Sequence, residues 1–182
     1  MAAPELSLSH FGIYVYDMKL MERFYTELLG FVVTDRGNIR GRDLLFLSRS
    51  PDDHHQIVMA GGRTGKPDDQ VINQLSFRVG SLDDLKAFYG DLKRRTDVRE
   101  ISPISHGNAW SVYFRDPENN RLEVFTDAPW YVTQPRGDKL DLSLSNDEIV
   151  RQTEAACRDD PGFMPVAQWQ ADFKQRLAAA KH

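Results

Sequence analysis

Four places along the chain carry side chains that could hold a metal ion. His10 and Gln74 stand 64 residues apart, each at the start of a run rich in β-forming residues. Glu123 lies between two apolar residues near the end of a third run, and the segment His54–Gln56 lies at the corresponding end of the first half. Imidazole nitrogens and carboxylate or amide oxygens suit Fe(II), Mn, Ni, Co or Zn better than Ca or Mg. These residues therefore predict a divalent-metal site.

An internal repeat places these side chains at matched positions. Leu8–Val15 precedes Ile72–Val79 by 64 residues, and Phe24–Leu28 precedes Phe88–Leu92 by the same offset. Two segments that keep one offset predict two copies of one structural unit of about 60 residues. His10 and Gln74 occupy the same position in the two copies, so a pseudo-twofold pairing of the copies would make them face each other.

Each copy predicts a strand, a helix and then three strands. The helix of each copy has one apolar face with i, i+3, i+4, i+7 spacing, formed by Met21, Phe24, Tyr25 and Leu28 and by Leu85, Phe88, Tyr89 and Leu92. Asp17 and Ser81 are the expected N-caps, because short oxygen-bearing side chains accept from free helix N–H groups. The later strands are expected at residues 31–34, 43–47 and 56–59 and at residues 98–101, 110–114 and 121–125.

These elements predict an α+β fold of two tandem βαβββ modules. Module one spans about 6–62 and module two about 70–127, within one domain of residues 1–127. We expect the modules to form a curved mixed sheet around a metal-binding cavity, with the polar residues at matched strand ends lining that cavity.

Residues 128–182 follow no such repeat. Prolines predict an extended arm first. Ser145 and Glu148 have capping-box spacing, which predicts a helix that ends at about Cys157. A last helix is expected over about 166–179, with one apolar face formed by Trp169, Phe173 and Leu177. We expect this helical extension to pack on the two-module domain or on a partner subunit.

Composition excludes several classes of protein. The chain has 182 residues and a formal net charge of −4. Its one cysteine, Cys157, excludes an internal disulfide framework and a multi-thiolate metal cluster. Mild acidity argues against a nucleic-acid partner. No apolar run approaches the roughly 18 residues of a membrane span, and the first residues do not read as a secretory signal, so we expect a cytoplasmic protein.

Each proposed ligand also has an alternative interpretation. His10 could be an ordinary strand histidine with satisfied hydrogen bonds. Glu123 could pair with Arg121 or Arg115. Gln74 could serve as a hydrogen-bonding partner of a ligand, because a neutral amide oxygen binds metals more weakly than imidazole does. The matched placement in the repeat favours metal ligation by His10 and Glu123, and it leaves Gln74 open.

The paired units, the strand-borne His10 and the closing run Phe114–Phe125 together resemble the vicinal oxygen chelate superfamily. The closing run contains an Asp-Pro-x-x-Asn-x-Leu-Glu pattern, the most specific mark of the likeness. This superfamily includes glyoxalase I, the bleomycin-resistance proteins and the extradiol ring-cleaving dioxygenases. The resemblance covers about residues 6–127.

Further residues resemble the catalytic half of the extradiol dioxygenases. That resemblance implies Fe(II)-dependent cleavage of a catechol-like aromatic diol with O2. Its metal site would consist of His10, Gln74 and Glu123, with Gln74 standing where the family has a second histidine. The resemblance also implies His55 as the acid/base group and His106 and Tyr113 as hydrogen-bonding groups to substrate.

Two other functions stay open within the resemblance. Glutamine is a metal ligand in glyoxalase I-like lyases and isomerases, but those proteins usually carry a carboxylate at the end of both modules, and residues 54–60 contain none. A metal-free, drug-sequestering protein would need neither His10 nor Glu123. Superfamily members commonly form homodimers, so a homodimer is also expected.

Overall fold

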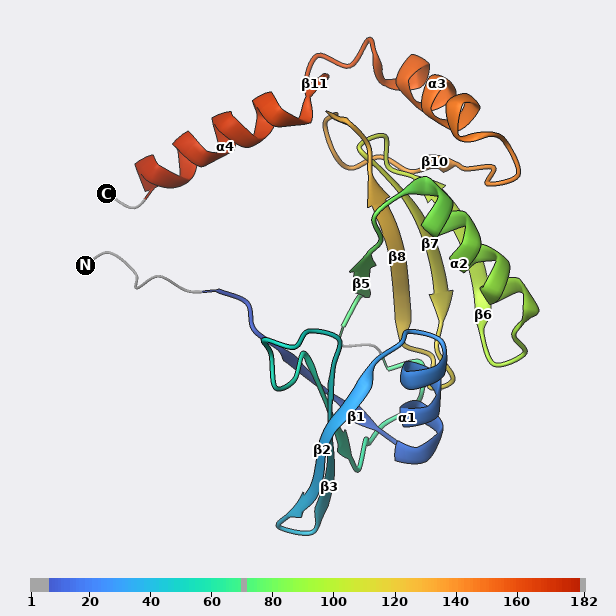
Figure 1. Ribbon diagram of the computed structural model, residues 1–182, viewed down its shortest axis with the longest axis vertical. Coiled ribbons are helices and arrows are strands. Elements are labelled where there is room, and N and C mark those ends of the chain that lie inside the picture. Colours follow the sequence, from blue (N-terminus) through green and yellow to red (C-terminus); the bar gives the residue numbers. More distant parts are fainter. Residues whose placement is uncertain (1–6, 70–71, 181–182) are drawn as a thin grey trace. The chain divides into compact units, whose positions relative to one another are not determined.

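The computed structural model describes residues 7–69 and 72–180 (Figure 1). The expected module starts, at about residues 6 and 70, lie outside the described residues, as do residues 1–6, which form most of the N-terminal segment expected not to be a secretory signal. By their contacts the described residues divide into two compact units. The N-terminal unit holds the described residues up to Ile72 together with Asp116–Asn120, and the C-terminal unit holds Asn73–Arg115 and Arg121 onward.

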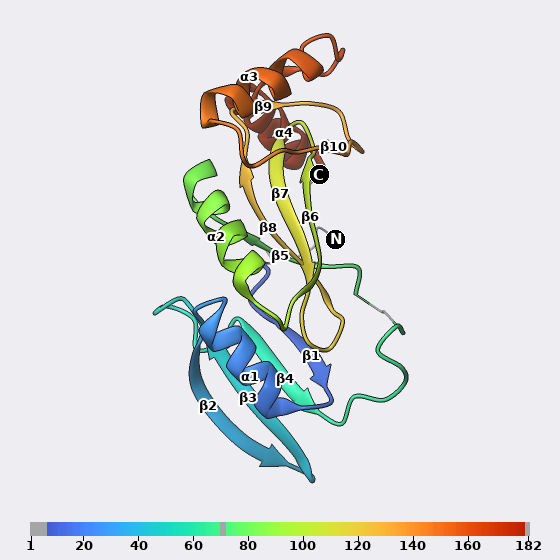
Figure 2. The same cartoon turned by 90° about the vertical axis from the view of Figure 1, so that its right-hand side faces the viewer.

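The N-terminal unit is a four-stranded sheet with one helix. Its strands are β1 (Phe11–Val15), β2 (Val32–Ile39), β3 (Arg42–Ser48) and β4 (Ile57–Gly61), in the order β1-β4-β3-β2. β1 pairs with β4 in parallel, and the other pairs are antiparallel. Helix α1 (Met18–Glu27) lies across this sheet in Figure 2. The predicted strand–helix–strand–strand–strand order is confirmed.

Alternation along the strands builds the core of this unit. One face of strands β1, β3 and β4 is buried and contributes Ile13, Val15, Leu45, Leu47, Ile57 and Met59. Helix α1 buries Met21, Phe24 and Tyr25, three of the four residues of its predicted face. Leu28 is the C-cap and is only half-buried. The Asp17 side chain accepts from the Leu20 N–H at 3.0 Å, which confirms the predicted cap.

The C-terminal unit repeats this topology. Its strands are β5 (Leu75–Arg78), β6 (Arg99–Ser105), β7 (Ala109–Arg115), β8 (Arg121–Asp127) and β10 (Asp138–Lys139), in the order β10-β6-β7-β8-β5. β5 pairs with β8 in parallel, as β1 does with β4. Helix α2 (Leu82–Arg94) starts at the predicted cap Ser81 and lies along this sheet (Figure 1). Leu85 and Leu92 are fully buried, whereas Phe88 and Tyr89 are half-buried.

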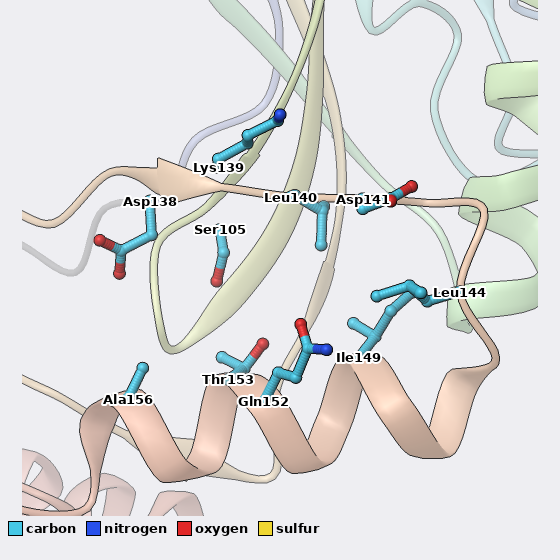
Figure 3. Close-up of a pocket in the computed structure, with 10 residues that line it drawn as sticks. All are labelled: Ser105, Asp138, Lys139, Leu140, Asp141, Leu144, Ile149, Gln152, Thr153 and Ala156. Carbon is cyan, nitrogen blue, oxygen red and sulfur yellow. The ribbon is translucent and has the colours of Figure 1, made fainter.

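The C-terminal extension groups with the second unit. A two-stranded sheet pairs β9 (Trp130–Tyr131) with β11 (Met164–Pro165). Helix α3 (Asn146–Cys157) starts at Ser145, whose hydroxyl accepts from the Glu148 N–H, so the predicted cap and helix end are confirmed. Figure 3 shows α3 facing the segment that follows β10, with Leu140, Ile149 and Thr153 directed into a pocket of about 180 Å³.

Helix α4 (Val166–Ala180) matches the predicted last helix. The Trp169 ring stacks on Tyr131 and on Phe173, with ring centroids 5.1 Å apart in both pairs. Phe173 and Leu177 nevertheless stay exposed. Packing of the predicted apolar face is therefore observed only near its start. None of the described helices is both long enough and apolar enough to cross a membrane.

A buried carboxylate organises the turn between β7 and β8. Asp116 is fully buried, and its Oδ1 accepts from the backbone N–H groups of Glu118 and Asn120. Its Oδ2 accepts from the Asn120 side-chain amide at 2.8 Å. Burial is the largest influence on this group and raises the pKa of Asp116 to about 6, although the hydrogen bonds from Asn120 and Glu118 oppose that change.

This pKa predicts a pH-dependent stability difference between the wild type and Asp116→Asn. A folded-state pKa about two units above the unfolded value amounts to about 3 kcal/mol. Above pH 6 the folded state holds Asp116 as a buried carboxylate, which lowers the free energy of unfolding. As the pH falls from about 6 to 4, Asp116 is protonated in the folded state but still largely ionised in the unfolded state, and this difference stabilises the folded state. We expect urea unfolding to show that the free energy of unfolding of the wild type, relative to that of the variant, rises by about 2–3 kcal/mol as the pH falls over that range. A difference that stays constant with pH would contradict this.

Candidate metal and catalytic site

Glu123 is the centre of a buried polar cluster in the C-terminal unit. It lies on β8, where its neighbours in the sheet are Ser76 on β5 and Tyr113 on β7. The Glu123 residue is only 6% exposed. Its Oε2 accepts from Ser76 Oγ at 2.5 Å and from Gln74 Nε2 at 2.8 Å. Carboxylates are rarely buried without such partners, so this placement marks Glu123 as a functional candidate.

Gln74 reaches this cluster as a donor. It lies one residue before β5, at the position that corresponds to His10 before β1. Its amide nitrogen faces Glu123 and also donates to Ser76 Oγ at 3.2 Å. This arrangement matches the alternative interpretation, in which Gln74 hydrogen-bonds to a metal ligand. A half-turn of the amide about its terminal bond would present the oxygen instead.

The two residues that resemble substrate-binding groups lie in the same cluster. His106 Nε2 is 2.9 Å from the Tyr113 hydroxyl and 3.8 Å from Glu123 Oε1. Burial, with a smaller contribution from Glu123, raises the pKa of Tyr113 to about 12. The phenol therefore stays protonated at neutral pH and can donate a hydrogen bond. Gln74, His106, Tyr113 and Glu123 are thus brought together within one unit.

The arginines considered as partners of Glu123 have other contacts. Arg115 Nε donates to the Glu100 carboxylate at 2.8 Å. The Arg121 guanidinium lies over the Tyr113 ring, 4.2 Å from its centroid. The basic side chain described beside Glu123 is that of His106, whose Nε2 lies 3.8 Å from Glu123 Oε1.

The remaining candidate residues lie in the N-terminal unit. His10 is exposed and precedes β1, so it is not a buried strand histidine. Its ring lies against the His55 ring, with centroids 4.2 Å apart. The Phe46 ring meets His55 edge-on at 5.2 Å. Partial burial, together with neighbouring His10 and His54, lowers the pKa of His55, so this imidazole is neutral at pH 7.

A chain of hydrogen bonds orients His55. Asp35 Oδ2 is 2.9 Å from His54 Nε2, and His54 Nδ1 is 2.8 Å from His55 Nδ1. The carboxylate can only accept, so His54 carries its proton on Nε2 and its Nδ1 accepts from His55. In neutral His55 the lone pair is then on Nε2. This is the tautomer that a general base with a free Nε2 needs.

The strand registers correct one expected correspondence. We placed His54–Gln56 at the position of Glu123 in the first module. Phe11 pairs with Ile57, and the equivalent Leu75 pairs with Leu122, so Glu123 corresponds to Val58. The histidines precede β4 and lie outside the matched pair. The first module therefore carries an apolar side chain where the second carries its buried carboxylate.

Two contributors were missed by the sequence reasoning. Ser76 donates to Glu123, and Asp35 orients His54. Both depend on strand pairing between distant segments, although the parallel pairing of the first and last strands of a module could have indicated Ser76. Within either unit, the described residues include no cluster of three or more His, Cys, Asp or Glu placed to hold a metal.

Comparisons with known proteins identify relatives of this chain. "Biphenyl-2,3-diol 1,2-dioxygenase 3" from Rhodococcus globerulus is 26% identical over 125 residues, which cover 66% of this chain and 63% of that protein. "Biphenyl-2,3-diol 1,2-dioxygenase 2" from the same organism is 28% identical over 91 residues, covering 48% and 47%. The chain thus matches less than two thirds of the length of these curated relatives.

Solved structures share the fold. A glyoxylase/bleomycin resistance protein/dioxygenase domain from Frankia sp. EAN1pec has a TM-score of 0.54 at 23% identity, covering 68% of this chain and 99% of that one. The fosfomycin resistance protein FosX from Mesorhizobium loti has a TM-score of 0.51 at 17% identity, covering 65% and 89%. FosX from Listeria monocytogenes, solved with Mn(II) and sulfate, has a TM-score of 0.50 at 17% identity, covering 67% and 93%.

The family assignment follows from the sequence match and the shared fold. The model of the Glyoxalase/Bleomycin resistance protein/Dioxygenase superfamily matches residues 7–124, most of the chain. The repeated strand order of the two units is the architecture that the resemblance implied. The chain belongs to the glyoxalase/bleomycin resistance protein/dioxygenase superfamily.

Proposed function

We propose that this chain is a metal-dependent dioxygenase that cleaves a catechol-like aromatic diol with O2. The observation that carries the proposal is the cluster around Glu123, in which a buried carboxylate, an imidazole and a protonated phenol lie together. The names of the two curated relatives support an aromatic diol as the substrate class.

The donor set fits a divalent transition metal. Glu123 Oε2 is held by Ser76 and Gln74, whereas Oε1 has His106 as its described polar neighbour at 3.8 Å. Carboxylate, imidazole and amide donors suit Fe(II), and also Mn, Ni, Co or Zn. We propose Glu123 and His10 as ligands and Gln74 as a third ligand after its amide turns. When bound, Fe(II) would favour deprotonation of the diol and bring diol and O2 together.

We propose separate roles in proton transfer and substrate binding for the side chains that do not bind the metal. His55, neutral and with its Nε2 lone pair free, is proposed to take a proton from a substrate hydroxyl and to return it later. His106 and Tyr113 are proposed to hydrogen-bond to the substrate, with His106 Nε2 accepting from a substrate hydroxyl and the Tyr113 phenol donating to the oxygen on which negative charge develops. The Phe46 ring beside His55 offers an apolar contact for an aromatic substrate.

The two alternative functions fit the residues less well. A glyoxalase I-like lyase would draw a carboxylate from each module, but the residue that corresponds to Glu123 is Val58. A metal-free sequestering protein would give no reason to bury a carboxylate beside a glutamine, a serine and a histidine.

Gln74→His is expected to raise Fe(II) affinity by about tenfold or more, because it restores an imidazole donor beside Glu123. Calorimetric titration with Fe(II) under anaerobic conditions measures this change. Asn73→His, which places an imidazole on the exposed neighbouring residue, is the matched control. An unchanged or lower affinity in Gln74→His would show that the hydrogen bond to Glu123 is the role of Gln74.

The proposed function is tested by purifying the protein anaerobically, measuring its metal content and following O2 uptake with a panel of catechols. Iron-dependent formation of a yellow ring-cleavage product is the expected result. Tight Ni or Zn binding with turnover of a thiol hemiacetal, and no reaction with any catechol, would identify a lyase. Absence of metal binding, with His10→Ala unchanged in ligand binding, would identify a sequestering protein.

A further inference from the structure

The C-terminal arm, residues 128–139, contacts and fixes the loop that carries His106. This loop, His106–Asn108, joins β6 to β7. Trp130 Nε1 donates to the Gly107 carbonyl at 2.7 Å. Gln134 Nε2 donates to the His106 carbonyl at 2.7 Å and to Asn108 Oδ1 at 3.0 Å. The loop is therefore fixed from the arm side by one buried hydrogen bond from Trp130 and by two exposed ones from Gln134.

Close packing against Gly107 also restricts the position of the loop. Gly107 has φ +79°, a left-handed conformation that favours glycine. A Cβ at this position would lie 2.6 Å from Val132 Cγ1 on the arm and 2.9 Å from Cys157 Sγ on α3. The arm and α3 thus touch the loop backbone directly, with no room for a side chain.

The arm also makes the hydrogen bond that decides where the His106 proton lies. His106 Nδ1 is 2.6 Å from the Arg136 carbonyl oxygen. A carbonyl can only accept, so Nδ1 carries the hydrogen, and Nε2 of the neutral ring presents a lone pair. The Tyr113 hydroxyl, 2.9 Å away, then donates to Nε2.

The accepting carbonyl is itself fixed. The Arg136 guanidinium donates to the Ala156 carbonyl of α3 at 2.8 Å and to Asp138 Oδ2 at 2.5 Å. Asp138 begins β10, which pairs with Ser105 at the end of β6. Arg136 is therefore anchored to α3 on one side and to the main sheet on the other.

We infer that the C-terminal arm, residues 128–139, is a positioning element for His106, which it holds as the Nδ1–H tautomer with Nε2 directed at Tyr113 and Glu123. For catalysis the inference rests on the proposed function. A neutral imidazole with its lone pair on Nε2 can accept a hydrogen bond from a substrate hydroxyl on the reacting side. The opposite tautomer would present an N–H there and remove that acceptor.

The tautomer can be read directly from long-range ¹H–¹⁵N correlation spectra of the full chain, recorded at a pH where His106 is neutral. His106→Gln assigns the signal. We expect the Nδ1–H pattern in the wild type. In Arg136→Ala, which frees the arm carbonyl from its anchors, we expect mixed tautomers and a kcat lower by about tenfold or more with little change in KM. Arg158→Ala, which removes an exposed ion pair on α3, is the control.

An Nε2–H pattern in the wild type would overturn the inference without need of any variant. Tautomer populations unchanged in a folded Arg136→Ala protein would also overturn it. If the Nδ1–H pattern is present in the wild type and lost in Arg136→Ala, the inference holds even where no catechol is cleaved. In that case only the proposed function fails.

Discussion

Glu123→Gln is expected to lower the proposed ring-cleavage activity by about a thousandfold or more, because several kcal/mol of barrier lowering would depend on the metal that this carboxylate is proposed to hold. The substitution keeps the size of the side chain and an oxygen that can accept from Ser76. It removes the negative charge, so Fe(II) affinity should fall together with activity. Steady-state kinetics and anaerobic Fe(II) titration measure the two effects.

A control variant and a folding measurement distinguish loss of metal binding from loss of folding. Glu154→Gln changes an exposed carboxylate on α3 in the same way and should leave activity and metal binding unchanged. Circular dichroism melting of both variants checks that each folds. A Glu123→Gln protein that is folded, retains its iron and cleaves catechols at more than a tenth of the wild-type rate would exclude Glu123 as the metal carboxylate.

Glu118→Ala is expected to destabilise the N-terminal unit by about 3–5 kcal/mol, because it leaves a buried cation and two amide groups without their acceptor. The Glu118 carboxylate accepts from the backbone N–H groups of Tyr16 and Asp17, both at 2.7 Å. Arg63 Nη1 lies 3.5 Å from the same carboxylate and donates to the Glu118 carbonyl at 3.0 Å. The side chains of both ion-pair partners are largely buried, at 4% and 11% exposure.

Hydrogen exchange followed by mass spectrometry suits this prediction. All three tryptophans, at positions 110, 130 and 169, belong to the C-terminal unit, so tryptophan fluorescence would not report on this one. Peptides from β1 and α1 should exchange much faster in Glu118→Ala. Glu22→Ala is the matched control, since Glu22 also pairs with an arginine, Arg36, but in an exposed position that is worth about 1 kcal/mol at most. Similar protection in the two variants would contradict the predicted role of Glu118.

Most of the fold could be predicted from local patterns. The 64-residue offset gave the repeated strand order, and the caps Asp17, Ser81 and Ser145 gave three helix starts, because each depends on residues close together in the chain. The counterpart of Glu123 was misplaced for a different reason. The first strands of the two modules, β1 and β5, keep the offset of 64 residues. The strands that pair with them, β4 and β8, are offset by one residue more, because Val58 is the residue that corresponds to Glu123. A shift of one residue moves a side chain to the other face of a sheet, and an offset alone does not reveal it.

The candidate site was predictable where side-chain types carried the information. Glu123 was chosen from its place in the strand pattern and His106 and Tyr113 by resemblance, and the three side chains lie together in the C-terminal unit. The groups that orient them were not predictable in this way. Ser76 reaches Glu123 through strand pairing, and the acceptor for His106 is the backbone carbonyl of Arg136. A backbone carbonyl has the same chemistry at every residue, so the residue types in the sequence do not indicate which carbonyl accepts from His106.

The most direct test of the proposed dioxygenase is the fate of isotopically labelled oxygen. Protein loaded anaerobically with Fe(II) would be mixed with biphenyl-2,3-diol and ¹⁸O2, and the product would be analysed by mass spectrometry. We predict a ring-opened product that contains both ¹⁸O atoms of one O2, formed by the wild type and not by Glu123→Gln. Iron-loaded wild-type protein that consumes no O2, or that returns this diol and simpler catechols unchanged, would contradict the account.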